Sequence, residues 1–178
     1  GYVSVPLYPT LAADTVRQIL EHSESKLLFV GKLDDWDLMK RGVPAGLPCI
    51  ALPLAPKNDF PQWDDIVART RPLEGNPVRD GAELCTLMYT SGTTGKPKGI
   101  VMTHRRYCET SKITPFLFGF KPDDRLYSGL SLTHANAQVI TLGTALVNAI
   151  PCVLSRRFSK SRLWDITRKY GCTNFTLL

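Results

Sequence analysis

The chain has 178 residues, of which 43% are hydrophobic and 21% charged, values typical of one globular domain with its own core. It shows no apolar run long enough to span a membrane, no signal peptide at its start, and no C-x-x-C pair or zinc pattern. The net charge of +6 arises from residue 101 onward, where 11 Lys and Arg oppose 4 Asp and Glu, but no nucleic-acid motif accompanies it, so nucleic acid is not the expected partner.

Strand-like and helix-like patterns alternate over the first 80 residues. Thr10 is predicted to cap a helix that reaches residue 22 and carries an apolar stripe of Leu11, Val16, Ile19 and Leu20. The Pro- and Gly-rich stretch 32–60 predicts loops with one strand. A later helix is expected to turn its apolar residues inward, namely Trp63, Ile66 and Val67. The elements expected in this half are strands at 3–8, 26–30 and 48–52 and helices at 10–22 and 61–70.

The same alternation continues to the end of the chain. Thr103 and Ser159 each stand before a helical pattern and are the predicted N-caps. The expected strands are 84–89, 100–102, 126–130, 151–154 and 172–178, and the expected helices are 103–116, 135–148 and 159–170. Alternation of this kind predicts an α/β fold with a largely parallel sheet flanked by helices. Both ends of the chain read as strands, so we expect part of a larger domain, truncated at both ends.

A loop of small and polar residues joins the strands predicted at 84–89 and 100–102. Its glycines permit close approach of the backbone to a ligand, and its backbone N–H groups can form an anion-binding nest. Its hydroxyls and ammonium groups can neutralise a triphosphate. The residues concerned are Thr90, Ser91, Gly92, Thr93, Thr94, Gly95, Lys96 and Lys98, with Pro97 stiffening the turn. The composition and spacing therefore predict a phosphate-binding loop, rather than a hairpin turn whose hydroxyls face water.

The spacing excludes a Walker A loop. That motif requires G-x-x-x-x-G-K followed by Ser or Thr. In this chain the residue five before Gly95 is Thr90, and Lys96 is followed by Pro97. P-loop kinases and P-loop NTPases are therefore excluded.

The segment Tyr-Thr-Ser-Gly-Thr-Thr-Gly-Lys-Pro-Lys-Gly at 89–99, with Val-Met-Thr-His at 101–104, resembles the signature of the adenylate-forming superfamily. That superfamily includes acyl-CoA synthetases, peptide-synthetase adenylation domains and luciferases. Residues 5–11 and 25–30 resemble long-chain fatty acyl-CoA synthetases, and 136–138 is similar to the carnitine-CoA ligase-like branch. The resemblance covers residues 1–178 but only the middle of the family's N-terminal domain, so it implies one partial AMP-binding domain.

The resemblance also implies site residues. Positions from Thr90 to Lys98 would hold the β and γ phosphates of ATP, with Thr90 as a ligand of Mg²⁺, and His134 would line the acyl pocket. Ser131 and Thr133 depart from the family, which has Pro and an aromatic residue before this His. The family's later Thr-Glu motif, ribose-binding Asp, hinge and C-terminal Lys have no match, so no catalytic residue is expected here, and we expect the isolated chain to be inactive.

An intact relative activates a carboxylic acid with ATP, releasing pyrophosphate, and CoA then displaces AMP from the acyl-adenylate. The expected ligands are thus ATP, Mg²⁺, CoA and a carboxylic acid, with fatty acid favoured. Aryl, carnitine-like and amino acids remain alternatives, although an amino acid would call for an acidic residue that 135–148 lacks. A further alternative is an inactive nucleotide-binding fragment. The expected location is the cytoplasm, with peripheral membrane contact left open and no oligomeric state predicted.

Three histidines and two arginines also have plainer interpretations. His134 stands where a helix cap is common, and His104 is expected at a helix start. His22 has no neighbour in the sequence that suggests catalysis. Arg105 and Arg106 are expected on a solvated helix face rather than in a binding site.

Overall fold

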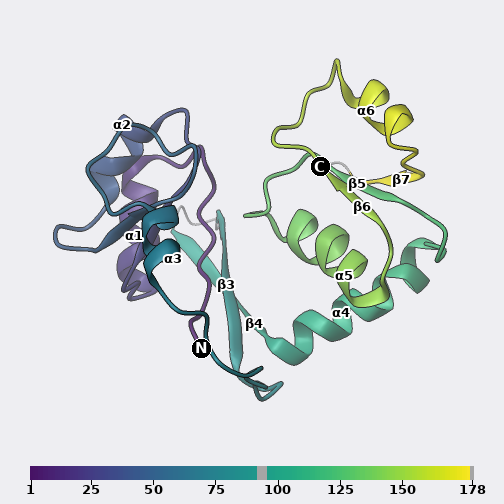
Figure 1. The fold of residues 1–178 in the computed structure, drawn as a ribbon, viewed down its shortest axis with the longest axis horizontal. Helices are drawn as coiled ribbons and strands as arrows, with labels where there is room; N and C mark the ends of the chain where they lie inside the picture. The colour runs from purple at the N-terminus through teal and green to yellow at the C-terminus, as the bar shows by residue number, and fades with distance from the viewer. Residues whose placement is uncertain (92–95, 177–178) are drawn as a thin grey trace. The chain divides into compact units, whose positions relative to one another are not determined.

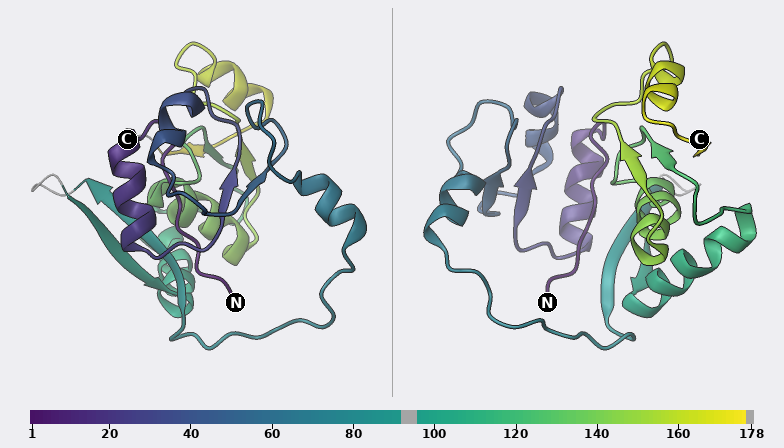
Figure 2. Two further views of the ribbon diagram at one scale, coloured as in Figure 1. Left: turned by 90° about the vertical axis from the view of Figure 1, so that its left-hand side faces the viewer. Right: turned by 45° about the vertical axis from the view of Figure 1, so that its right-hand side comes forward.

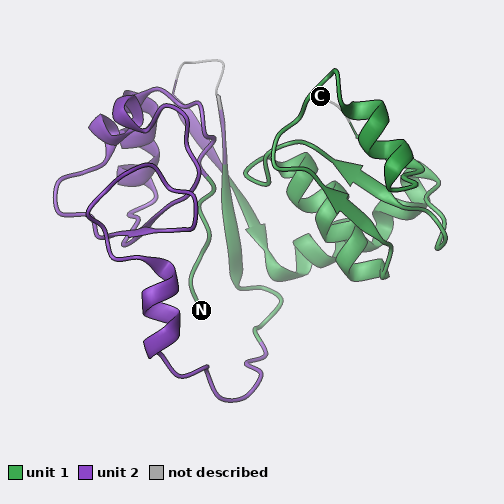
Figure 3. Ribbon diagram, turned by 45° about the horizontal axis from the view of Figure 1, so that its top comes forward, with its two compact units in different colours: residues 1–6, 79–88, 100–178 green, residues 7–78, 89–99 purple. Residues whose placement is uncertain are grey.

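The computed structural model describes residues 1–91 and 96–176. The chain divides into two compact units, which Figure 3 distinguishes by colour. Unit 1 comprises Gly1–Pro6, Arg79–Met88 and Ile100–Leu178, and unit 2 comprises Leu7–Val78 and Tyr89–Gly99. Parallel strands and interleaved helices occur in both units, which confirms the predicted α/β class.

Unit 2 is built around a short parallel sheet. Strand β1 (Leu28–Val30) pairs with β2 (Cys49–Ala51), with Phe29 opposite Ile50. The helices of this unit are α1 (Ala13–His22), α2 (Trp36–Met39), the 3-10 turn η1 (Lys40–Gly42) and α3 (Trp63–Arg69), labelled in Figure 1 except η1. A core of five buried residues holds the unit together: Val16, Leu20, Val30, Trp36 and Met39.

Helix α1 confirms Val16, Ile19 and Leu20 of the predicted apolar stripe, but Leu11 lies before the helix and the predicted cap is wrong. Val16, Ile19 and Leu20 are buried, as the 3.6-residue period requires. The helix begins at Ala13 with Ala12 as its N-cap and no side-chain cap bond. Thr10 instead lies in a turn, in which the Leu11 N–H donates to the Tyr8 carbonyl over 3.3 Å. That turn occupies the residues at which the helix was predicted to begin.

Two further predictions in unit 2 were wrong. The stretch 32–60 contains helix α2 and the turn η1 in addition to loops and β2, because Trp36 and Met39 bury themselves in the core. In α3 no residue is buried: Trp63 is 39% and Val67 is 51% exposed. Trp63 packs edge-on against Phe29, with 5.8 Å between ring centroids, so it contacts an exposed side chain of β1 instead of a core.

Unit 1 contains a three-stranded parallel sheet in the order β6-β5-β7. Its strands are β5 (Leu126–Ser128), β6 (Cys152–Leu154) and β7 (Asn174–Phe175), with Leu126 opposite both Cys152 and Asn174. Helix α6 (Leu163–Lys169) lies on one side of this sheet (Figures 1 and 2). The π-helix η2 (Asn136–Gly143) and the helix α5 (Thr144–Asn148) lie on the other side and continue into each other.

The predicted strands at 84–89 and 100–102 are neighbours, as expected. They correspond to β3 (Leu84–Ser91) and β4 (Pro97–Thr103), which pair as one two-stranded sheet. The strand predicted at 3–8 is reduced to a single parallel bridge between Ser4 and Thr86. Ser4 donates to the Cys85 carbonyl over 3.1 Å and accepts from the Leu87 N–H over 2.9 Å, so this edge of β3 is covered along one residue only.

Helix α4 (His104–Phe118) confirms its predicted start and contains a proline. Thr103 is the N-cap, and its Oγ1 accepts from the Arg106 N–H over 3.2 Å. Pro115 has no N–H and leaves the Ser111 carbonyl without its helical donor. The Asn148 side chain of α5 donates to that carbonyl over 2.9 Å. The helix therefore tolerates its proline because a neighbouring helix supplies the missing hydrogen bond.

The end of the chain differs from the prediction at one cap and one strand. Helix α6 begins at Leu163 after Arg162, and Ser159 does not cap it. Ser159 accepts instead, through its backbone carbonyl, from the Arg162 N–H over 3.1 Å. Strand β7 covers two of the residues predicted at 172–178, of which 177–178 lie outside the described residues. Among the residues that the structure describes, no helix is long and apolar enough to cross a membrane.

Candidate functional site

The predicted phosphate loop lies between the ends of β3 and β4. Thr90 is exposed near the end of β3, and the backbone of Ser91 completes that strand. Lys96 and Lys98 are exposed where the chain returns into β4. Gly92, Thr93, Thr94 and Gly95, which the sequence assigns to phosphate binding, lie outside the described residues. The described part thus presents one hydroxyl and two ammonium groups to solvent at this end of the hairpin.

Tyr89, the first residue of this loop segment, is held by a histidine distant in sequence. The phenol Oη of Tyr89 lies 2.7 Å from Nδ1 of His22, the last residue of α1. The two rings meet edge to face, at 89° and with 5.7 Å between their centroids. Burial raises the pKa of the Tyr89 phenol above its ordinary value, so the hydroxyl keeps its proton at neutral pH. The phenol can therefore act as the donor in its contact with His22.

Gly99 closes the same segment and lies against the Tyr89 ring. A Cβ built on Gly99 would be 3.2 Å from Cζ, 3.4 Å from Cε1 and 3.5 Å from Oη of Tyr89. The 3.2 Å distance to Cζ is tighter than ordinary van der Waals contact, so a side chain at this position would press on the ring. The absence of a Cβ at residue 99 lets the ring lie across the returning strand.

His134 lies at the start of η2 and supports that start. Its Nδ1 accepts from the Asn136 N–H over 3.1 Å, and its carbonyl accepts from the Gln138 N–H over 3.0 Å. The imidazole is half-buried. This geometry is that of a helix cap, the plainer interpretation of this residue from the sequence.

Gln138, the third residue of η2, has a buried amide oxygen. Its side-chain Oε1 is buried and has no hydrogen-bond partner among the described residues. Its backbone carbonyl, by contrast, accepts from the Tyr107 hydroxyl over 2.7 Å. A buried acceptor without a donor costs about 1–3 kcal/mol, and π-helical turns frequently occur at functional sites. Both features mark this stretch of η2 as a candidate for ligand contact.

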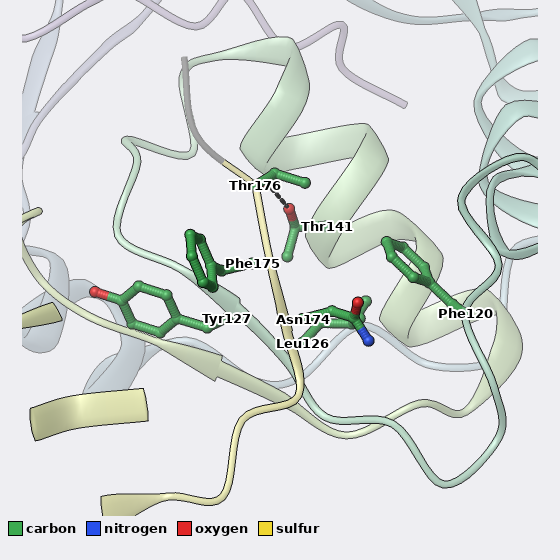
Figure 4. Close-up of a pocket in the computed structure, with 7 residues that line it drawn as sticks. All are labelled: Phe120, Leu126, Tyr127, Thr141, Asn174, Phe175 and Thr176. Carbon is green, nitrogen blue, oxygen red and sulfur yellow. Dashed lines mark hydrogen bonds between the residues drawn. The ribbon is translucent and has the colours of Figure 1, made fainter. Parts of the chain in front are cut away.

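A narrow apolar crevice lies beneath the same helix in unit 1 (Figure 4). Phe120, Leu126 and Phe175 supply most of its walls, and Thr141 and Thr176 close it with a 3.0 Å hydrogen bond. Thr176 also donates to Asn136 Oδ1 over 2.8 Å. Side chains fill the crevice closely, so it ties η2 to the end of the sheet rather than providing room for a ligand.

The structure thus places the predicted residues in two separate groups. The predicted phosphate loop belongs to the β3–β4 hairpin, whereas His134 belongs to unit 1. Arg105 and Arg106 are exposed on α4, as predicted. His22 and Gln138 were not predicted as functional residues. His22 and Tyr89 are 67 positions apart in the sequence, and the local sequence around either residue does not predict their contact. No metal-binding group of three or more His, Cys, Asp or Glu occurs among residues 1–91 and 96–176.

Comparisons with known proteins cover the entire chain. The family model described as AMP-binding enzyme matches residues 1–178. A sulfoacetate–CoA ligase of Cupriavidus necator is 33% identical over 174 residues, which make up 97% of this chain and 34% of the ligase. Long-chain fatty acid transport protein 1 of Homo sapiens is 36% identical over 106 residues, 60% of this chain and 16% of that protein.

The fold is also that of solved structures. The crystal structure of the anthranilate CoA ligase AuaEII in complex with anthranoyl-AMP matches with a TM-score of 0.82 at 19% identity. The match covers 97% of this chain and 34% of that one. These matches cover almost all of this chain but only about a third of the length of each ligase.

Proposed function

The chain belongs to the AMP-binding enzyme family, and from this premise we propose that residues 1–178 are part of the N-terminal domain of a longer acid–thiol ligase. The proposed enzyme activates a carboxylic acid with ATP to an acyl-adenylate and releases pyrophosphate. The thiol of CoA then attacks the acyl carbon and displaces AMP. The similarity to a protein named as a CoA ligase over 97% of the chain supports this class of reaction.

The observation that carries the proposal is the hairpin of β3 and β4 with its exposed polar end. Lys96 and Lys98 offer ammonium groups and Thr90 a hydroxyl, which is the donor chemistry that a polyanionic triphosphate requires. We assign the β and γ phosphates of ATP to the segment from Thr90 to Lys98. In this role the segment binds the leaving pyrophosphate and stabilises the charge that develops on it.

The donor set also fits magnesium bound through ATP. Mg²⁺ usually keeps several waters and takes few protein ligands beside substrate phosphates. A single hydroxyl such as that of Thr90 fits this pattern, and we propose it as the protein ligand in this chain. When bound, the ion would neutralise charge on the phosphate oxygens.

Long-chain fatty acid is the first candidate for the acid. The human relative is named as a long-chain fatty acid transport protein, which supports this choice. We place the acyl chain near His134, at the start of η2. We propose that the enzyme works in the cytoplasm. A membrane that supplies the fatty acid would be contacted at its surface.

A second candidate is an acid that carries a hydroxyl or another hydrogen-bond donor. The buried Oε1 of Gln138 favours it, because a substrate donor would satisfy an acceptor that has no partner among the described residues. Carnitine-like and aryl acids with a hydroxyl belong to this class. An unsubstituted fatty acid would leave this acceptor unpaired.

The full-length enzyme that contains this chain would test both candidates. We expect acid-dependent exchange of pyrophosphate into ATP, followed by CoA thioester formation, with a long-chain fatty acid. Gln138→Leu should leave a fatty acid substrate unaffected but should lower kcat/KM for a hydroxylated acid about two- to tenfold, if the second candidate is right. Gln18→Leu, the same change at an exposed position of α1, is the control. Absence of exchange with every acid would contradict the proposed function.

A further inference from the structure

We propose that His22 is a positioning residue for the phosphate loop: it holds the ring of Tyr89 across Gly99 and so fixes the two ends of the loop relative to each other. This inference rests on the proposed function, because it assigns a task to the loop that binds ATP. None of the residues concerned is expected to touch the reacting atoms. The role is therefore one of positioning, not of chemistry.

One side chain, that of Tyr89, spans both ends of the loop. Tyr89 opens the segment and Gly99 closes it, and the ring lies where a Cβ on residue 99 would be only 3.2 Å from Cζ. Residues Tyr89–Gly99 group with Leu7–Val78, which include α1, and not with the remainder of β3 and β4. The contact between the ring and Gly99 thus sits at the base of the loop.

The ring of Tyr89 needs a partner to stay across Gly99. Tyr89 is only half-buried, so packing alone leaves other rotamers accessible. The 2.7 Å hydrogen bond to His22 Nδ1 and the edge-on ring contact select one of them. His22 in turn is carried by α1, whose residues Val16 and Leu20 are fixed in the core of unit 2. The chain of contacts runs from that core to the base of the loop.

The contact of His22 with Tyr89 would orient the donors of the loop before ATP binds. Several donors must meet the phosphates in one geometry, and fixing them before binding removes an entropic cost at the moment of binding. Loss of the tether would leave the hydroxyl of Thr90 and the ammonium groups of Lys96 and Lys98 present but less well oriented. The expected result is weaker use of ATP, with the carboxylic acid bound as before.

The test is a double-mutant cycle in the full-length enzyme. Tyr89→Phe keeps the ring and removes its hydroxyl, and His22→Phe keeps a ring and removes the acceptor nitrogen. Each should raise KM for ATP roughly three- to tenfold, the range for loss of one neutral hydrogen bond, and leave KM for the acid within twofold. The double variant should be no worse than either single variant, because both remove the same bond. His22→Asn, which retains an acceptor near the same place, should recover at least half of the loss.

Tyr2→Phe is the matched control, since the Tyr2 side chain is 100% exposed. The proposal is overturned if the wild-type enzyme is active but the single variants leave KM for ATP unchanged. It is also overturned if their effects add, or if KM for the acid rises equally, since a general loss of folding would do that. Failure of the wild-type enzyme to use ATP with any acid would instead contradict the proposed function, so the two failures are distinguishable.

Discussion

Single residues at the end of the β3–β4 hairpin differ in what they can contribute to binding. Lys98 lies in β4 within the loop segment, whereas Arg105 lies beyond it, in the first turn of α4. Both are exposed cations close together in the sequence. Only Lys98 belongs to the segment that we assign to the phosphates. A comparison of variants of the two residues therefore distinguishes a specific contact with phosphate from a general effect of positive charge.

Lys98→Ala in the full-length enzyme should lower kcat/KM for ATP roughly ten- to a hundredfold, because it removes a charge-assisted hydrogen bond to phosphate. Arg105→Ala should change that ratio less than twofold. Steady-state kinetics at varied ATP and saturating acid measure both. If the Arg105 variant is damaged and the Lys98 variant is not, then the phosphates lie against α4 and our assignment of the loop is wrong.

At the scale of secondary-structure elements, α4 and α5 depend on each other. Pro115 interrupts the hydrogen bonding of α4, and the amide of Asn148, at the end of α5, replaces the missing donor at the Ser111 carbonyl. Ser111 is fully buried, so water cannot take over this role. The packing of one helix therefore stabilises an irregularity in the other.

Asn148→Leu should lower the free energy of unfolding by about 1–3 kcal/mol, the cost of a buried carbonyl without a donor. In a Pro115→Ala background the helix regains an N–H at residue 115, and the same substitution should cost less than half as much. Urea unfolding of the four proteins of this cycle measures the difference. Equal costs in the two backgrounds would show that Asn148 does not compensate for the proline.

At the scale of the whole molecule, the chain spans about a third of the length of the ligases that it matches from end to end. Attack on the α-phosphate requires the acid, the nucleotide and several charges to be held together in one geometry. The roles that we propose for residues of this chain are phosphate binding and contact with the acyl chain, and none of these residues is assigned a catalytic role.

The isolated chain of residues 1–178 should therefore form no acyl-adenylate. Exchange of labelled pyrophosphate into ATP, measured with a fatty acid and with a hydroxylated acid, should stay at the level of a blank. The full-length enzyme at the same concentration provides the positive control. Clear acid-dependent exchange by the isolated chain would show that its residues suffice for the first half-reaction.

The sequence by itself determined the features that depend on local pattern. The alternation of strand-like and helix-like apolar patterns predicted the α/β class. The apolar pattern of α1 predicted that Val16, Ile19 and Leu20 are buried, and Thr103 caps α4 as predicted. The eleven-residue segment at 89–99 placed the chain in its family, because few chemistries need that order of glycines, hydroxyls and lysines. Thr10 and Ser159 failed as caps because turns upstream occupy those positions, a competition that residue type alone does not reveal.

Only the tertiary structure decided the contacts between distant residues. Two hydrogen bonds join different elements, namely His22 with Tyr89 and the Asn148 amide with the Ser111 carbonyl. Folding also buries the side-chain oxygen of Gln138 away from any donor among the described residues. A local pattern is read over one or two turns, whereas these contacts depend on which surfaces meet after the chain has folded. The sequence therefore determines where the proposed phosphate loop lies, whereas the contact of His22 with Tyr89 appears only once the chain has folded.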